Sequence, residues 1–412
     1  MSEITFHIIN TVLKNFLDNA QIGELNDILS GLSGKKKKSG RAITSADKEQ
    51  LNTNILSKRP FVTHIDLLIT FAAERLTKAK FIEFLLYLGE TCISHGELDV
   101  ACQIYDHILS SVSTDNAMEN IAAHSLLALG EIYSRQAHWK KSIDYINHAK
   151  KLFYKQKDLR GIAKCNNLLG TIYGDRGKSK KAKSSFENSL TFLNHKTDTA
   201  LIGMVEMNLG ILNNIQGNQD EALSYYQRAL IKYDQLKDLR RISQLRHNLG
   251  MLYSQKGEYD SALNEFDTSI AIAIKADYLP DLALSYLSKA YIYAQLNDFP
   301  LAVAFADKSL EMCRKLNDRL SIADIYKVKG IVERKRKHYD LAKNYFLTSL
   351  RINIELENPM NQAETLYELG ILYREMGMAV DAKKSFKSAL ANFKKMEARY
   401  LAEKVKQTLA EV

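Results

Sequence analysis

The residue types that most often carry catalysis or bind metals occur in this chain without the spacing that those chemistries require. The four cysteines, Cys92, Cys102, Cys165 and Cys313, include no Cys-x-x-Cys pair, so neither a zinc site nor a redox pair is indicated. The ten histidines are scattered, and no His-Glu-x-x-His, Gly-x-Ser-x-Gly or kinase signature occurs. We therefore expect no catalytic residues, no metal site and no cofactor, and we expect the cysteines to be reduced and buried.

One basic stretch, GLSGKKKKSGR over residues 31–41, has to be weighed as a phosphate-binding loop. Only two residues separate its glycines where a P-loop needs four, and no strand pattern precedes it. Its cations supply 5 of the 9 charges by which Lys and Arg (57) exceed Asp and Glu (48). No nucleic-acid-binding signature accompanies this excess, which argues against nucleic acid as a partner. We interpret residues 31–43 as a flexible basic linker.

The composition is that of a folded soluble protein, with 46% hydrophobic and 25% charged residues over 412 positions. The first residues, MSEITFHIINTVLKNFL, lack the basic leader and cleavage site of a signal peptide. No apolar run reaches the length of a membrane span. We therefore expect a cytoplasmic protein.

The elements that position the polar side chains recur about every forty residues. A small residue that usually follows a leucine, here called the Gly slot, is followed three residues later by a tyrosine in most copies. An alanine usually comes twelve residues after the Gly slot, and a large side chain, mostly aromatic, sixteen after it. The Gly slots are Gly89, Gly130, Gly170, Gly210, Gly250, Ala290, Gly330 and Gly370, spaced by 41 and then six times by 40 residues.

Each copy predicts two helices, A and B, that pack against each other. Leu249 and Tyr253 are four residues apart and share a face of helix A, as Ala262 and Phe266 do on helix B. Small residues in the Gly and Ala slots would let the two backbones approach closely, and Gly257 or its equivalent would separate the helices. Acidic or amide residues suited to N-caps recur 28 residues after the Gly slot. They are Asp158, Asp198, Asp238, Asp318 and Asn358.

This pattern resembles the tetratricopeptide repeat (TPR) family, which pairs Leu-Gly and Tyr on helix A with Ala and an aromatic on helix B. The resemblance covers about residues 80–396. The period of 40 residues exceeds the family's usual 34 and is similar to the long repeats of kinesin light chains, LGN-type adaptors and bacterial Rap regulators. The resemblance implies an all-α, right-handed α-solenoid (TPR superhelix) of eight helix-pair repeats, with helix A lining a concave groove.

The regions outside the repeats complete the predicted organisation. We expect an N-terminal amphipathic helical segment over 1–30, the linker over 31–43 and a helical N-terminal cap over 44–80. The eight repeats would occupy 81–396, and a C-terminal capping helix 397–412.

Helical geometry predicts which side chains of helix A face away from helix B and toward the groove. Asn208 and Asn248 precede Leu-Gly, where the resemblance to kinesin-light-chain and LGN-type arrays implies hydrogen bonds to the backbone of an extended peptide. An Asn amide both donates and accepts, and methionines would offer adaptable apolar contacts. The alternative is that these asparagines cap a neighbouring backbone group or are merely solvated. The candidate groove residues are Lys164, Asn167, Met204, Met207, Asn208, Gln244, His247, Asn248 and Met251.

Farther along, the same helix face becomes basic. Lys327, Arg334, Lys335 and Arg374 are candidates for contacts with an acidic segment of a partner. The alternative is a solvated helix end.

The favoured function is a non-catalytic adaptor whose groove binds a peptide segment of a partner protein, apolar and in part acidic. A second hypothesis, from the Rap resemblance, is a peptide-sensing regulator that acts through its N-terminal helices. A third is a structural subunit of a larger assembly. The oligomeric state is not predicted by the sequence.

Overall fold

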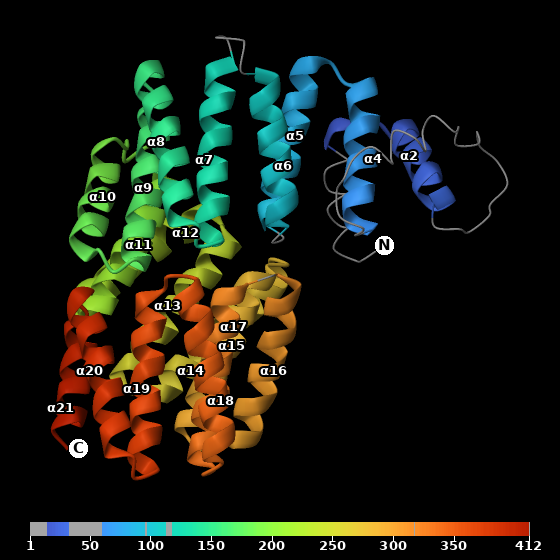
Figure 1. Cartoon of the computed structure of the whole chain (residues 1–412). Coiled ribbons are helices and arrows are strands. Elements are labelled where there is room, and N and C mark those ends of the chain that lie inside the picture. Colours follow the sequence, from blue (N-terminus) through green and yellow to red (C-terminus); the bar gives the residue numbers. More distant parts are fainter. Residues whose placement is uncertain (1–14, 33–59, 95–96, 113–117, 317, 412) are drawn as a thin grey trace. The chain divides into compact units, whose positions relative to one another are not determined.

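The structure is a computed structural model that describes residues 15–32, 60–94, 97–112, 118–316 and 318–411. In this part of the chain every regular element is an α-helix (Figure 1). The chain divides into two units, Met1–Ile132 and Tyr133–Val412, and the division falls within α7. The helices are α2 (Asn19–Leu32), α4 (Pro60–Arg75), α5 (Lys78–Ser94), α6 (Leu98–Val112), α7 (Glu119–Arg135), α8 (Trp139–Gln156), α9 (Leu159–Asp175), α10 (Ser179–Thr191), α11 (Thr199–Gln216), α12 (Gln219–Leu236), α13 (Leu239–Lys256), α14 (Tyr259–Lys275), α15 (Leu279–Gln295), α16 (Phe299–Lys315), α17 (Arg319–Lys335), α18 (Tyr339–Glu355), α19 (Pro359–Glu375), α20 (Ala379–Lys395) and α21 (Arg399–Ala410).

The predicted α-solenoid of helix pairs is confirmed. Within the described chain, eight pairs run from α5 and α6 to α19 and α20, and α21 follows. From α9 onward, each A helix packs against its own B helix, which in turn packs against the next A helix. Successive A helices also touch directly, so the second unit has one continuous apolar core built from all its repeats.

The Gly slot is explained by the aromatic ring that lies on it. A Cβ at Gly170 would be 2.5 Å from Cε1 of Phe186, and a Cβ at Gly250 would be 2.5 Å from the same atom of Phe266. Both rings are buried, so they cannot move aside. In the sixth repeat both partners differ from the pattern: Ala290 occupies the Gly slot, and Ala306 replaces the aromatic residue.

The turns and caps also follow the pattern, with one exception. Gly257 ends α13 at φ 79°, a left-handed conformation that favours glycine. Asp238 accepts a hydrogen bond from the backbone N–H of Arg241, and equivalent caps open α9, α17 and α19. Asp198 does not cap α11 in this way. Helix α10 ends early, at Thr191, and Asp198 instead accepts from the backbone N–H of Asn194 in the connecting turn.

The N-terminal expectations fall partly outside the described residues. Helix α2 overlaps the segment expected to be helical over 1–30 and extends two residues into the predicted linker, and α4 lies within the cap expected over 44–80. Arg75 of α4 forms an ion pair with Glu24 of α2 at 2.8 Å. Most of the linker predicted over 31–43, and the first part of the cap predicted over 44–80, lie outside the described residues.

Within the second unit, the last helices return to the third and fourth repeats (Figure 1). The Ser179 hydroxyl donates to the carbonyl oxygen of Met396 at 2.7 Å, across 217 residues of sequence. Lys180 forms an ion pair with Glu397 at 3.4 Å. A Cβ at Gly217 would lie 3.1 Å from Cβ of Tyr400. We call this contact, between residues 177–180 with 215–217 and residues 396–400, the seam.

Candidate functional site

Polar side chains on successive A helices meet according to one spacing rule. Residues that touch across two neighbouring A helices are mostly 37 or 41 residues apart, which is the 40-residue repeat minus three or plus one. The two offsets differ by four, one helical turn, so each side chain reaches two consecutive turns of the next helix. We call this line of side chains, from Asn167 on α9 to Thr408 on α21, the ladder.

The first stretch of the ladder brings together three of the predicted groove residues. Asn208 donates its amide hydrogen to Oδ1 of Asn167 at 2.9 Å. Asn167 in turn donates to the sulfur of Met204 at 3.3 Å. Asn208 thereby uses one of the four hydrogen bonds that its amide can make, and its own Oδ1 accepts none from the described residues.

Arg241 continues the ladder from α11 to α13. Its guanidinium donates to Oε1 of Gln244 at 2.7 Å and approaches the sulfur of Met204. Asp281, at the start of α15, is 4% exposed. Burial raises the pKa of this carboxyl to about 7, although Ser243, Gln244 and the arginines nearby act in the opposite direction. Sequence reasoning missed Arg241 and Asp281, because neither occupies a repeated position with a recognised role.

His247, three residues before its Gly slot, is held within the protein. Its Nδ1 lies 3.3 Å from the Ser285 hydroxyl on α15, and its ring lies 5.5 Å from the ring of Phe266. Burial lowers the pKa of His247 to about 4, so the imidazole is neutral at pH 7. It can offer a partner hydrogen bonds but no charge.

Asn248 and Met251 are the predicted residues that remain most available. The Asn248 side chain is half-buried and makes no hydrogen bond with the part of the chain that the structure describes. Met251 is 38% exposed, and its sulfur accepts a hydrogen bond from Ser288 at 3.4 Å. Lys164 is half-buried on α9.

Met207 lies elsewhere than expected. It is 5% exposed and belongs to the hydrophobic core with Tyr226 and Leu249. The A helix of the next repeat covers Met207, so it stabilises the stack and offers no surface to a ligand. Asn167, in the same slot, is also buried.

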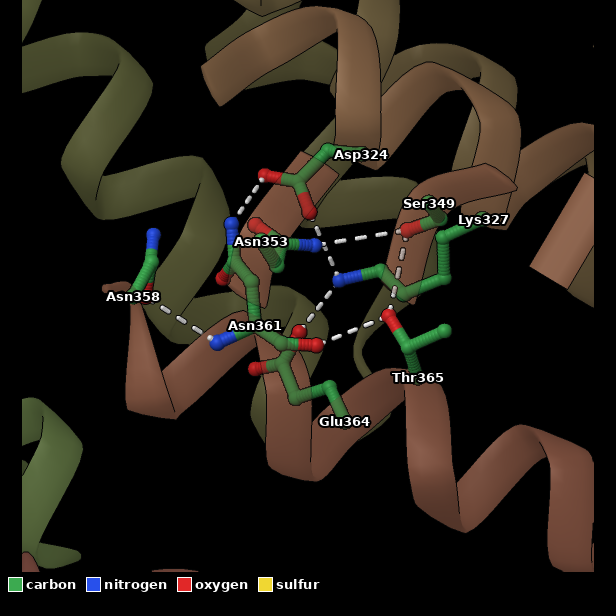
Figure 2. Close-up of polar contacts among 8 residues, drawn as sticks. All are labelled: Asp324, Lys327, Ser349, Asn353, Asn358, Asn361, Glu364 and Thr365. Atoms are coloured by element: carbon green, nitrogen blue, oxygen red, sulfur yellow. Dashed lines mark hydrogen bonds and ion pairs between the residues drawn. The ribbon is translucent and has the colours of Figure 1, made fainter. Parts of the chain in front are cut away.

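The later ladder, on α17 and α19, is built of internal ion pairs (Figure 2). Lys327 lies between Asp324, at 2.9 Å, and Glu364. Burial alone would lower the pKa of Lys327, but the two carboxylates outweigh it and raise that pKa above its usual range. Asn361 donates to Asp324 at 2.9 Å and completes the cluster.

The other three predicted cations are also engaged by the chain itself. Arg334 binds Glu368 at 3.2 Å and also Glu375. Lys335 donates to the carbonyl oxygens of Ala294 and Gln295, at 2.9 and 3.1 Å. Arg374 forms an ion pair with Glu411 at 3.1 Å. The run that reads as basic in the sequence is therefore largely neutralised in the fold, which removes the reason to expect an acidic partner there.

Comparisons with known proteins agree with this architecture. Tetratricopeptide repeat models match residues 199–275, 241–315, 281–355 and 364–395. The matched residues, 199–355 and 364–395, are therefore tetratricopeptide repeats. No curated protein sequence matches it.

Several solved structures share the fold at low sequence identity. The structure of a Rap protein complexed with competence and sporulation factor has a TM-score of 0.62 at 14% identity, covering 95% of this chain and 98% of that one. Aspartyl phosphate phosphatase F from Bacillus subtilis gives 0.52 at 13%, covering 95% and 94%. The Cut9–Hcn1 heterotetramer of the APC/C gives 0.54 at 16%, covering 85% and 60%. Identities this low establish the shared fold alone.

The described residues include no candidate membrane span and no candidate metal site. None of their helices has both the length and the apolar character that crossing a membrane requires. No three or more of their His, Cys, Asp or Glu side chains are placed to hold a metal ion.

Proposed function

We propose that this protein is a non-catalytic adaptor that binds an extended peptide segment of a partner along the ladder of α9, α11 and α13. The observation that carries the proposal is the Asn248 amide, which has no hydrogen-bond partner among the described residues and shares its helix with the exposed Met251. A half-buried amide without a partner is costly unless a ligand or water satisfies it.

The equivalent position one repeat earlier supports the same ligand. Asn208 occupies the slot of Asn248, and its Oδ1 is available to accept a hydrogen bond. An extended peptide has unpaired N–H and C=O groups at regular intervals, and an amide can satisfy both kinds. His247 is neutral and Met204 is apolar, so these two residues favour apolar side chains in the bound segment.

The proposal can be tested with peptides selected from a random display library against the whole chain. A selected peptide would be titrated by calorimetry against the wild type and against Asn208→Ala with Asn248→Ala. Each lost hydrogen bond should cost about 0.5–1.5 kcal/mol, which is roughly tenfold in affinity for the pair.

The matched control is Asn264→Ala with Asn344→Ala, two exposed asparagines on the B helices α14 and α18. This variant should bind as the wild type does. If the ladder variant binds with unchanged affinity while both proteins unfold alike, the binding site lies off the ladder.

A second function is favoured by the extent of the structural likeness. A match over 95% of this chain to the Rap protein complexed with competence and sporulation factor reaches beyond the repeats into the N-terminal helices. In this alternative the repeats sense a peptide, and the N-terminal helices act on a second protein.

Removal of residues 1–77, just before α5, separates the two functions. An adaptor keeps its peptide and its partner, whereas a regulator keeps the peptide and loses its effect on the second protein. Because one similar fold is that of an aspartyl phosphate phosphatase, the whole chain should also be assayed for phosphate release from a phosphorylated receiver domain. Release of phosphate would exclude the non-catalytic adaptor.

A further inference from the structure

An open cleft lies at the seam, and the peptide-binding proposal does not use it. The cleft has a volume of about 600 Å³, which is within the range of small-ligand sites. One wall is the turn between α9 and α10, and the other walls are the turns that follow α18 and α20. The Ser179–Met396 hydrogen bond holds the first and last of these turns together.

The walls of this cleft are strongly cationic. Five cations line it, and Glu357 and Glu397 are the carboxylates among its lining residues. Glu397 is paired with Lys180. The other four cations have no carboxylate within ion-pair distance in the described chain, and they are Arg176, Lys178, Lys181 and Lys395.

The positive charges of the other three cations act on Lys178. Arg176 is the largest cause of a lowered pKa at Lys178, and Lys181 and Lys395 contribute to it. Lys395 is more than 200 positions away in sequence, so the seam adds its charge to that of the two local cations. The first turn of α10 adds to the positive potential, because its backbone N–H groups have no side-chain cap.

We propose that the cleft at the seam binds a small polyphosphate anion, either free or as the phosphate chain of a nucleotide, between Arg176, Lys178, Lys181 and Lys395. A multivalent phosphate fits because it neutralises several cations at once and accepts hydrogen bonds from ammonium, guanidinium and helix N–H groups.

The remaining lining residues indicate what part of such a ligand is recognised. The apolar side chains in the cleft, Ile354 and Pro359, are aliphatic, and no aromatic ring of the described residues lines it. A nucleotide base would find no ring to stack on, so the site recognises phosphates and discriminates weakly between bases. Since its walls belong to the third repeat and to the last two, the ligand would also hold the seam closed.

The test uses inorganic tripolyphosphate as the probe, added to the whole chain in calorimetry and in thermal unfolding. We expect measurable binding that weakens with added salt and raises the midpoint of unfolding. The triple variant Lys178→Gln, Lys181→Gln and Lys395→Gln should lose at least about tenfold in affinity, because each charge-assisted contact is strong.

The control removes the same charge outside the cleft, by Lys383→Gln, Lys384→Gln and Lys387→Gln on the exposed face of α20. It should bind tripolyphosphate within about twofold of the wild type. Equal losses in the two variants would show only general attraction to a basic protein and would overturn the proposal, as would the absence of wild-type binding.

Two further ligands identify the source of the anion. ATP that binds as tightly as tripolyphosphate, or more tightly, supports the site and indicates a nucleotide. ATP that binds more weakly supports a free polyphosphate. An octamer of glutamate that binds more tightly than tripolyphosphate would overturn the small-anion proposal, because the cleft would then recognise an acidic protein segment. None of these outcomes depends on the ladder, so the peptide proposal is tested separately.

Discussion

Two glycines of α9 provide a sharp test of how the helix pairs are held together. Gly170 and Gly174 lie one turn apart on the same helix, and neither has a positive φ. A Cβ at Gly170 would meet three ring atoms of Phe186, at 2.5, 2.6 and 3.0 Å. A Cβ at Gly174 would meet only the Cβ of Ala182, at an ordinary distance of 4.0 Å. The same substitution, glycine to alanine, should therefore have opposite effects at the two positions.

The magnitude follows from two opposing effects. Alanine is favoured over glycine in a helix by about 1 kcal/mol, and both substitutions gain this. Inserting a methyl group into a packed site costs about 1–3 kcal/mol, and only Gly170→Ala incurs this cost. Gly174→Ala should raise the free energy of unfolding by up to about 1 kcal/mol, and Gly170→Ala should lower it by about 1 kcal/mol.

Urea unfolding followed by circular dichroism would measure both variants, with amide hydrogen exchange of α9 and α10 reporting the local effect. Adding Phe186→Leu to Gly170→Ala should restore part of the loss, so the two changes together should cost at least about 1 kcal/mol less than their sum. If Gly170→Ala proves as stable as Gly174→Ala, the ring does not occupy the Gly slot and the helix-pair packing described above is wrong.

Three further substitutions test the electrostatics of the fold. Lys327→Met leaves its two carboxylate partners facing each other, so the free energy of unfolding should fall by about 1–3 kcal/mol; urea unfolding would measure this, and no change would show that the cluster is solvated. Arg374→Ala removes an exposed pair and should change the same quantity by less than about 1 kcal/mol. Asp281 has its pKa raised from 3.8 to about 7, so the stability it contributes is fully present below pH 3.8 and lost as the pH rises through about 7. Asp281→Asn should therefore become more stable than the wild type between pH 5 and 9, by on the order of 2 kcal/mol, and parallel pH profiles would contradict this.

The repeat pattern was enough to predict the fold because its signals are local and repeated. Gly250 and Phe266 are close in the chain, and the same pairing of small and aromatic residues recurs in other copies. The exchange to Ala290 and Ala306 in one repeat strengthens the pattern, since both partners change together. Met207 shows where this reasoning stops. Its slot predicts a surface position, but the next A helix covers it, and a pattern within one repeat contains no information about the neighbouring repeat.

The same limit explains why the internal ion pairs of the basic run were not predicted. Lys327 and Glu364 are 37 residues apart, and Arg334 and Glu375 are 41 apart. The carboxylate partner of each cation is therefore found only by comparing adjacent repeats at the 40-residue period minus three or plus one.

The same two offsets also join Asn167 to Met204 and to Asn208. A ladder position of helix A is left for a ligand where the residues at both offsets are bonded elsewhere. Residues 37 and 41 after Asn248 are Ser285 and Lys289; these bond to His247 and to Asp267, and neither bonds to Asn248. The amide of Asn248 is thus unmatched by the repeat that follows it, which is why the proposed peptide site is placed there and not on the ion-paired helices α17 and α19.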